Sequence, residues 1–104
     1  MFQKYTDTTC GGFQIHITDR QQFSPWKLGQ ALMKCFHQEL GPHFSWKKPP
    51  YEYEYDRPPI DFINGTDRLR HWVEQPSWQW ENLLEMEKAG QENFQATRNN
   101  ALLY

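Results

Sequence analysis

Apolar and polar residues alternate along the stretch that follows Gly11 and Gly12, and this pattern predicts a β-strand. The apolar positions are Phe13, Ile15 and Ile17, and the polar positions that alternate with them are Gln14, His16 and Thr18. Because successive side chains of a strand point to opposite faces, the alternation places three apolar side chains on one face. Asp19 and Arg20 add charge where the run ends. We therefore expect a central strand near residues 12–18.

Helical spacing follows over residues 25–40. Ser24 can accept a hydrogen bond at the start of a helix, and Pro25 suits the first helical position. Gly41 and Pro42 end the helix, because glycine accepts a left-handed cap and proline cannot continue the hydrogen bonding. The apolar stripe expected to face the core is Leu28, Leu32, Cys35, Phe36 and Leu40. A helix is expected here, with Cys35 as a buried free thiol.

Two further helices are expected in the second half of the chain, near residues 67–75 and 78–95. Thr66 and Ser77 can cap their N-termini. The apolar residues on the expected inner faces are Leu69, Trp72, Val73, Trp80, Leu83, Leu84, Met86 and Phe94. The apolar end of the chain, residues 101–104, is expected to pack as an extended tail.

Together these elements predict an α+β fold in a single domain spanning residues 1–104. A small sheet, with its central strand near residues 12–18, would be packed by about three helices. These helices would cover residues 25–40, 67–75 and 78–95.

A second alternating stretch, residues 49–59, places two Pro-Pro pairs around three tyrosines and three acids. The tyrosines are Tyr51, Tyr53 and Tyr55, and the acids are Glu52, Glu54 and Asp56. Proline favours extended backbone, so the tyrosines would line one face and the acids the other. One interpretation is a surface that presents aromatic rings beside carboxylates to a sugar. The other is a strand that buries its tyrosines and exposes its acids. The pattern is compatible with both.

Composition narrows the class of protein. Aromatic residues make up 16% of the chain and mean hydropathy is -0.94, so aromatic rings must supply much of the buried apolar area. A formal net charge of -2 with dispersed Lys and Arg offers no basic stripe, which argues against nucleic-acid binding. No apolar run approaches the roughly 20 residues of a membrane span, and no signal peptide is evident. Cys10 and Cys35 are too few to define a disulfide framework, and whether they pair stays open.

Motifs for metal, cofactor or nucleophilic chemistry are absent, so no metal and no cofactor are expected. Carboxylates remain as candidates. Glu52 and Glu54 would lie roughly 7 Å apart on one face of a strand, a separation compatible with glycoside hydrolysis. Any strand gives that spacing, so it does not identify an enzyme. Asp19 and Arg20, at the end of the first strand, could orient a hydroxyl or carboxylate ligand, or could form an ion pair that pins the strand.

Several ordered motifs together resemble one family. Residues 10–20, Cys-Gly-Gly-Phe-Gln-Ile-His-Ile-Thr-Asp-Arg, resemble the C-x-G-[hydrophobic]-Q-[hydrophobic]-H-[hydrophobic]-T-D-R signature of peptidoglycan exo-β-N-acetylmuramidases. Further matching motifs are F-x-P at 23–25, YEY at 51–53, PID at 59–61 and LLY at 102–104. Ala101 stands where the family usually has tyrosine, and Phe13 where a smaller aliphatic residue is common. The resemblance extends over nearly the whole chain.

The resemblance implies a two-domain enzyme. A larger, Rossmann-like N-terminal domain would carry the catalytic glutamate, and a smaller C-terminal domain would close one wall of the cleft. This chain resembles the C-terminal domain, so it is expected to be inactive alone and to have no catalytic residue of its own. The family releases N-acetylmuramic acid from the non-reducing ends of peptidoglycan fragments in cell-wall turnover and recycling. Its members are often exported to the periplasm or outside the cell.

Two hypotheses follow. In the first, the chain is an auxiliary substrate-cleft domain that helps to bind a muramic-acid sugar. The expected substrate-binding residues are His16, Asp19, Arg20, Tyr51, Glu52, Tyr53 and Asp61, and Arg20 would hold the lactyl carboxylate of the sugar. In the second, it is a structural or protein-interaction domain without a ligand site. A small hydrolase that uses Glu52 or Glu54 is a third possibility, which turnover by this chain alone would establish.

Overall fold

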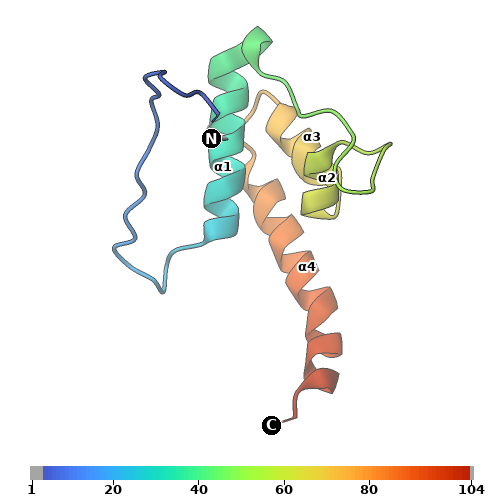
Figure 1. Ribbon diagram of the computed structural model, residues 1–104. Coiled ribbons are helices and arrows are strands. Elements are labelled where there is room, and N and C mark those ends of the chain that lie inside the picture. The colour runs from blue at the N-terminus through green and yellow to red at the C-terminus, as the bar shows by residue number, and fades with distance from the viewer. Residues whose placement is uncertain (1–3, 104) are drawn as a thin grey trace.

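A short central helix, α3 (Arg68–Glu74), contacts the three other α-helices of the computed structural model shown in Figure 1. The structure describes residues 4–103. The remaining helical segments of that range are α1 (Pro25–Leu40), the 3-10 turn η1 (Gly41–His43), α2 (Pro59–Asn64) and α4 (Trp80–Ala101). The fold is therefore a small helical assembly centred on α3.

Local signals set both ends of α1. The Ser24 hydroxyl accepts a hydrogen bond from the Lys27 amide at 3.4 Å, and Pro25 occupies the first turn. Gly41 follows the last residue with φ +47°, a conformation that glycine adopts without strain. The predicted helix over 25–40 is confirmed. The prediction succeeded because the residues that begin and end the helix are its immediate neighbours in sequence.

The buried core is small and comes from α3 and α4. Leu69, Trp72 and Val73 of α3 and Leu83 of α4 are at most 3% exposed. Partly buried side chains packed around them are Trp26, Met33, Trp46 and Met86. The Trp72 ring also contacts two further tryptophan rings, Trp78 and Trp80, at centroid distances of 6.3 and 5.8 Å. Trp72 is thus the aromatic member of the buried core of residues 4–103, and the neighbouring Trp78 and Trp80 rings are 38% and 41% exposed.

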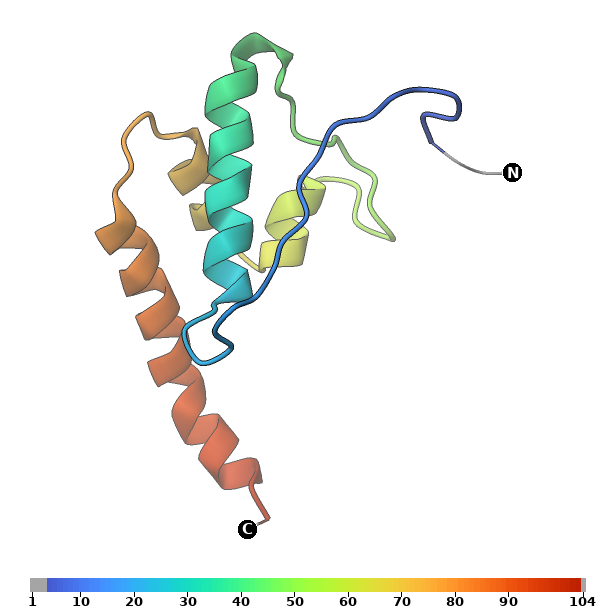
Figure 2. The same cartoon turned by 90° about the vertical axis from the view of Figure 1, so that its left-hand side faces the viewer.

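The second half of α4 leaves the core. Every residue from 88 to 101 is exposed, and Figures 1 and 2 show this part of the helix extending away from the others. Leu102 and Leu103, which follow it, are 48% and 93% exposed. The prediction that this end packs as an extended tail is wrong for these two residues; Tyr104, the last residue of the matching motif, lies outside the described residues.

The predicted α+β fold is wrong. Residues 4–103 contain no β-sheet, and their isolated β-bridge joins Tyr51 to Glu54 across a tight turn. Residues 12–18 are not helical but form no strand, and no backbone–backbone hydrogen bond joins residues 11–18 to any other part of residues 4–103. The alternating pattern favours a strand, but a strand also needs a hydrogen-bonding partner, which the described chain does not provide.

The helical predictions were more accurate. Helices expected near 67–75 and 78–95 correspond to α3 and α4, with α4 continuing to Ala101 through Gly90. Cys35, in contrast, is exposed rather than buried, and Cys10 and Cys35 are both free thiols. The α1 residue that is fully buried is instead Lys34, one position away. The inner face of α1 is therefore rotated relative to the predicted stripe.

Candidate functional site

The expected substrate-binding residues fall into two groups on opposite sides of α1. His16, Asp19 and Arg20 belong to the segment before α1, which runs along one side of that helix in Figure 1. Tyr51, Glu52 and Tyr53 belong to a turn on the other side, and Asp61 lies in α2. The structure thus does not gather all seven into one site.

Two members of the first group, His16 and Asp19, line an open cavity of about 250 Å³, and Arg20 follows them in sequence without lining it. The other lining residues are Ile17, Thr18, Gln22 and Phe23. A cavity of this size, with an imidazole, a carboxylate, a hydroxyl and an amide in its lining, can receive a small polar ligand.

Asp19 shapes the turn that leads into α1. Its Oδ1 accepts a hydrogen bond from the Gln21 amide at 2.9 Å, and its carbonyl accepts one from the Phe23 amide at 3.1 Å. Such bonds from an aspartate to the backbone two residues on are typical of turns. Arg20 is exposed, and among residues 4–103 no hydrogen bond or ion pair engages its guanidinium. A cation held next to a fixed turn is therefore available for an anionic ligand.

The second group occupies a closed turn, not the extended run that the sequence predicts. The Tyr51 amide donates to the Glu54 carbonyl at 3.0 Å, and the Glu54 amide donates back to Tyr51 at 2.9 Å. Glu52 takes the left-handed conformation, with φ +52°, and Tyr53 at the tip is 90% exposed. The turn projects one aromatic ring fully into solvent.

The side chain of Glu54 holds this turn to the residues that follow it. Its carboxylate accepts hydrogen bonds from the amides of Asp56 and Arg57, and from the Arg57 guanidinium at 2.8 and 3.1 Å. These hydrogen bonds, with the Arg57 side chain as the largest contributor, lower the pKa of Glu54. A glycosidase general acid needs the opposite shift, so Glu54 is unsuited to that role.

A second cavity, of about 290 Å³, lies beside this turn. Its walls come from α1, α2 and the connector between η1 and α2: Met33, Phe44, Ser45, Trp46, Lys47, Tyr51, Pro59, Ile60 and Ile63. The Tyr51 ring contacts the Phe62 ring edge-on at a centroid distance of 6.0 Å. Tyr51 is therefore held by the fold at the border of an apolar cavity, whereas Tyr53 is free of such contacts among the described residues.

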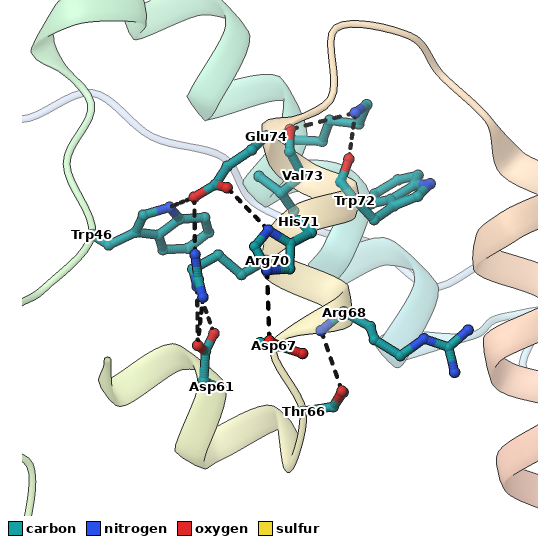
Figure 3. A network of polar contacts seen from close by, with 11 residues as sticks. Trp46, Asp61, Thr66, Asp67, Arg68, Arg70, His71, Trp72, Val73 and Glu74 are labelled. Carbon is teal, nitrogen blue, oxygen red and sulfur yellow. Dashed lines mark hydrogen bonds and ion pairs between the residues drawn. The ribbon is translucent and has the colours of Figure 1, made fainter. Parts of the chain in front are cut away.

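Asp61 belongs to a polar network that joins α2 to α3, drawn in Figure 3. Its two carboxylate oxygens accept hydrogen bonds from the Arg70 guanidinium at 2.8 to 3.0 Å, and Asp61 is 6% exposed. Arg70 also lies 3.5 Å from Glu74, whose carboxylate accepts a bond from the Trp46 indole at 2.9 Å. The bond to Asp61 raises the pKa of Arg70. Asp61 thus fixes α2 against α3, and the same network holds the connector between η1 and α2 through Trp46.

The buried charge that the sequence does not reveal is Lys34. Its ammonium donates to the carbonyls of Trp72, Val73 and Gln75 at 2.7, 3.4 and 2.5 Å, at the C-terminus of α3. It also lies 4.7 Å from the centre of the Trp72 ring. Burial lowers the pKa of Lys34. A lysine within an amphipathic helix usually faces solvent, and no local signal marks this one as buried.

The polar and aromatic side chains described above are of the kinds that bind small polar ligands. Among residues 4–103 no group of three or more His, Cys, Asp or Glu side chains is placed to hold a metal ion. Within the same part of the chain, no helix combines the length and apolar character needed to cross a bilayer. The groups available to contact a ligand are exposed aromatic rings, the guanidinium of Arg20 and hydrogen-bonding side chains.

Comparison with known proteins gives a consistent result. The sequence model of the family described as "Exo-beta-N-acetylmuramidase NamZ, C-terminal" matches residues 1–104. A relative from Bacillus subtilis (strain 168), the peptidoglycan beta-N-acetylmuramidase NamZ, is 26% identical over 104 residues. That match covers 99% of this chain and 23% of the relative, so the chain spans about a quarter of the relative's length. No solved structure matches the chain significantly.

Proposed function

Because this chain belongs to the family of C-terminal domains of NamZ exo-β-N-acetylmuramidases, we propose that it is an auxiliary domain of a cell-wall glycosidase. In this role it forms part of the wall of a substrate cleft and helps to bind a muramic-acid sugar. The cleavage itself belongs to an N-terminal catalytic domain. The lowered pKa and the internal hydrogen bonding of Glu54 argue against its acting as a general acid in this chain.

The observation that carries the proposal is the exposed, unengaged guanidinium of Arg20, which follows directly in sequence the His16 and Asp19 that line the cavity. A muramic-acid sugar differs from a plain N-acetylhexosamine by its lactyl carboxylate. A guanidinium can bind a carboxylate through two parallel hydrogen bonds, and the cavity supplies partners for the sugar hydroxyls. We assign the lactyl carboxylate to Arg20 and neighbouring sugar hydroxyls to His16 and Asp19.

The turn on the other side of α1 takes a second part of the substrate in this proposal. Tyr53 exposes a flat ring that can stack on an apolar sugar face, and Glu52 offers a carboxylate next to it. Tyr51 borders the adjoining cavity, and Asp61 acts by positioning α2. A substrate that contacts both groups must be longer than one sugar, because α1 lies between them.

A second candidate function is a structural or protein-interaction domain without its own ligand site. It is favoured by Asp61 and Glu54, whose carboxylates are both engaged by arginines within the chain. Here the matching motifs would serve the packing of this domain and its contact with a partner.

An NMR titration of the labelled chain, alone and joined to the N-terminal catalytic domain of a family member, tests the proposal. N-acetylmuramic acid is the ligand, and N-acetylglucosamine, which lacks the lactyl group, is the matched control. We expect shifts at residues 16–20 with the first sugar and much weaker ones with the second. Equal shifts with both sugars would remove the carboxylate assignment, and no shifts in the joined protein would favour the interaction domain.

Kinetics of the two-domain protein test Arg20 directly. Losing one charge-assisted contact costs about 1.5 to 3 kcal/mol, so Arg20→Ala should raise KM about 10- to 150-fold. The control is Arg68→Ala, which removes an exposed arginine from the start of α3. Unchanged KM in the Arg20 variant would refute its role.

A further inference from the structure

The segment before α1 has the sequence of a strand and no strand beside it. Residues 11–18 make no backbone–backbone hydrogen bond within residues 4–103, so their amides and carbonyls are free to pair. Phe13, Ile15 and Ile17 are 69%, 54% and 50% exposed although they alternate as one apolar face. The Phe13 ring touches the Phe36 ring of α1 at a centroid distance of 5.7 Å, which anchors one end of the segment.

An exposed strand of this kind is unfavourable for an isolated protein. Natural edge strands are protected by lysine, proline or a bulge, since unpaired edges otherwise add further strands. Residues 12–18, Gly-Phe-Gln-Ile-His-Ile-Thr, contain none of the protective residues, and charge returns only at Asp19. The contiguous apolar face and the free backbone both indicate a surface that is covered in the working protein.

We propose that residues 12–18 dock by strand addition onto an exposed sheet edge of the N-terminal part of the longer protein. The chain spans 23% of its Bacillus subtilis relative and matches a family described as C-terminal, so a partner of about three times its length is expected to precede it. In this arrangement the backbone forms a ladder with the partner edge, and the apolar face covers apolar side chains beside that edge.

The docked strand also explains why candidate ligand groups follow it directly. Asp19 and Arg20 come at the end of the segment, and the cavity lined by His16 and Asp19 lies there too. Strand addition would therefore bring these groups to the boundary between the two parts. The identity of the partner rests on the proposed function, whereas the strand addition itself can be measured without any sugar.

Amide hydrogen exchange resolved by NMR tests the inference, comparing this chain alone with the chain joined to the N-terminal part of a family protein from the same source. In an edge strand every second amide faces the neighbour. We expect one alternate set, either residues 13, 15 and 17 or 14, 16 and 18, to slow by about 100-fold or more in the joined protein. Residues 91–101 of α4 should not change.

Two matched pairs of variants separate a backbone ladder from simple apolar contact. Ile15→Lys should weaken association of the separately expressed parts by about 10-fold or more, and Gln14→Lys, on the opposite face, by less than about threefold. Ile15→Pro and His16→Pro each remove one backbone N–H, and the two N–H groups point to opposite edges of the strand. Only the variant that removes the N–H facing the partner should abolish the alternating protection.

Several outcomes would overturn the inference. Uniform protection, or equal effects of the two proline variants, would indicate docking without a ladder. Protection in the chain alone, with a dimeric mass in light scattering, would identify a second copy as the occupant. If residues 12–18 gained no amide protection in the joined protein, they would not pair with a sheet edge and the inference would be refuted. Sugar titration of the same samples tests the proposed function separately. A lost sugar response with retained amide protection would refute the proposed function and leave the strand addition intact.

Discussion

Lys34 offers the sharpest test of what holds this fold together. Replacing it with methionine keeps the unbranched stem up to the fourth side-chain atom and removes the ammonium. Three carbonyls at the end of α3 then lose their donor, since the last carbonyls of a helix have no partner within it. The contact with the Trp72 ring at 4.7 Å is weakened at the same time.

The expected cost follows from opposing terms. Each hydrogen bond to a charged donor contributes about 1.5 to 3 kcal/mol, and a desolvated cation–π contact about 2 kcal/mol. The opposing contribution is desolvation, because burying the ammonium of the fully buried Lys34 costs several kcal/mol. The methionine variant does not incur this cost. We expect Lys34→Met to lower the free energy of unfolding by about 3 kcal/mol, or the melting temperature by about 15 °C.

Urea unfolding followed by tryptophan fluorescence and far-UV circular dichroism measures this change. The control is Lys88→Met, because Lys88 lies in the exposed part of α4 and its ion pair with Glu92 at 3.7 Å is exposed on both sides. That variant should change stability by less than about 0.5 kcal/mol. If Lys34→Met matched the control, or were more stable than the parent, desolvation would outweigh the three hydrogen bonds and the argument would fail.

Three further predictions concern the turn, the ion pair and the glycines. The pKa of Glu54 is lowered in the fold, so its contribution to stability is present above its ordinary value of 4.5 and is lost as pH falls through the lower folded value. Carbon-detected NMR should show this midpoint, and an ordinary value would contradict the hydrogen bonding. Asp61→Asn should destabilise by about 1 to 3 kcal/mol in urea unfolding, whereas Asp67→Asn, at an exposed position, should change little. Gly65→Ala should destabilise by about 1 kcal/mol because φ is +72° there, while Gly90→Ala, inside α4 with open space around it, should stabilise by about 0.5 to 1 kcal/mol; calorimetry that gave both the same sign would refute this.

The candidate site was only partly visible from sequence. Family motifs predict His16, Asp19, Arg20 and the turn residues as ligand-binding, and that role stays a prediction. They do not show that α1 separates the two groups, since that separation depends on how the flanking segments leave the helix. Nor do they show that Asp61 is held by Arg70, nine residues further along.

Sequence by itself determined α1 and the approximate extents of α3 and α4, whereas α2 was not predicted and the N-caps of α3 and α4 are Asp67 and Gln79 in place of the predicted Thr66 and Ser77. Ser24 and Pro25 begin α1, and Gly41 and Gly65 end α1 and α2, because capping and positive φ are properties of neighbouring residues. Sequence also determined the alternation of residues 12–18, although the structure gives this segment no strand.

Only the tertiary structure decided which of these local tendencies were fulfilled. A sheet requires pairing between distant segments, and residues 12–18 find no partner in the described chain. Burial of Lys34 likewise depends on the C-terminus of α3, about 40 residues away, which supplies the carbonyls that make a buried charge tolerable. Such non-local partners are absent from any window of sequence, and this is why the fold class was missed while the three longer helices were found.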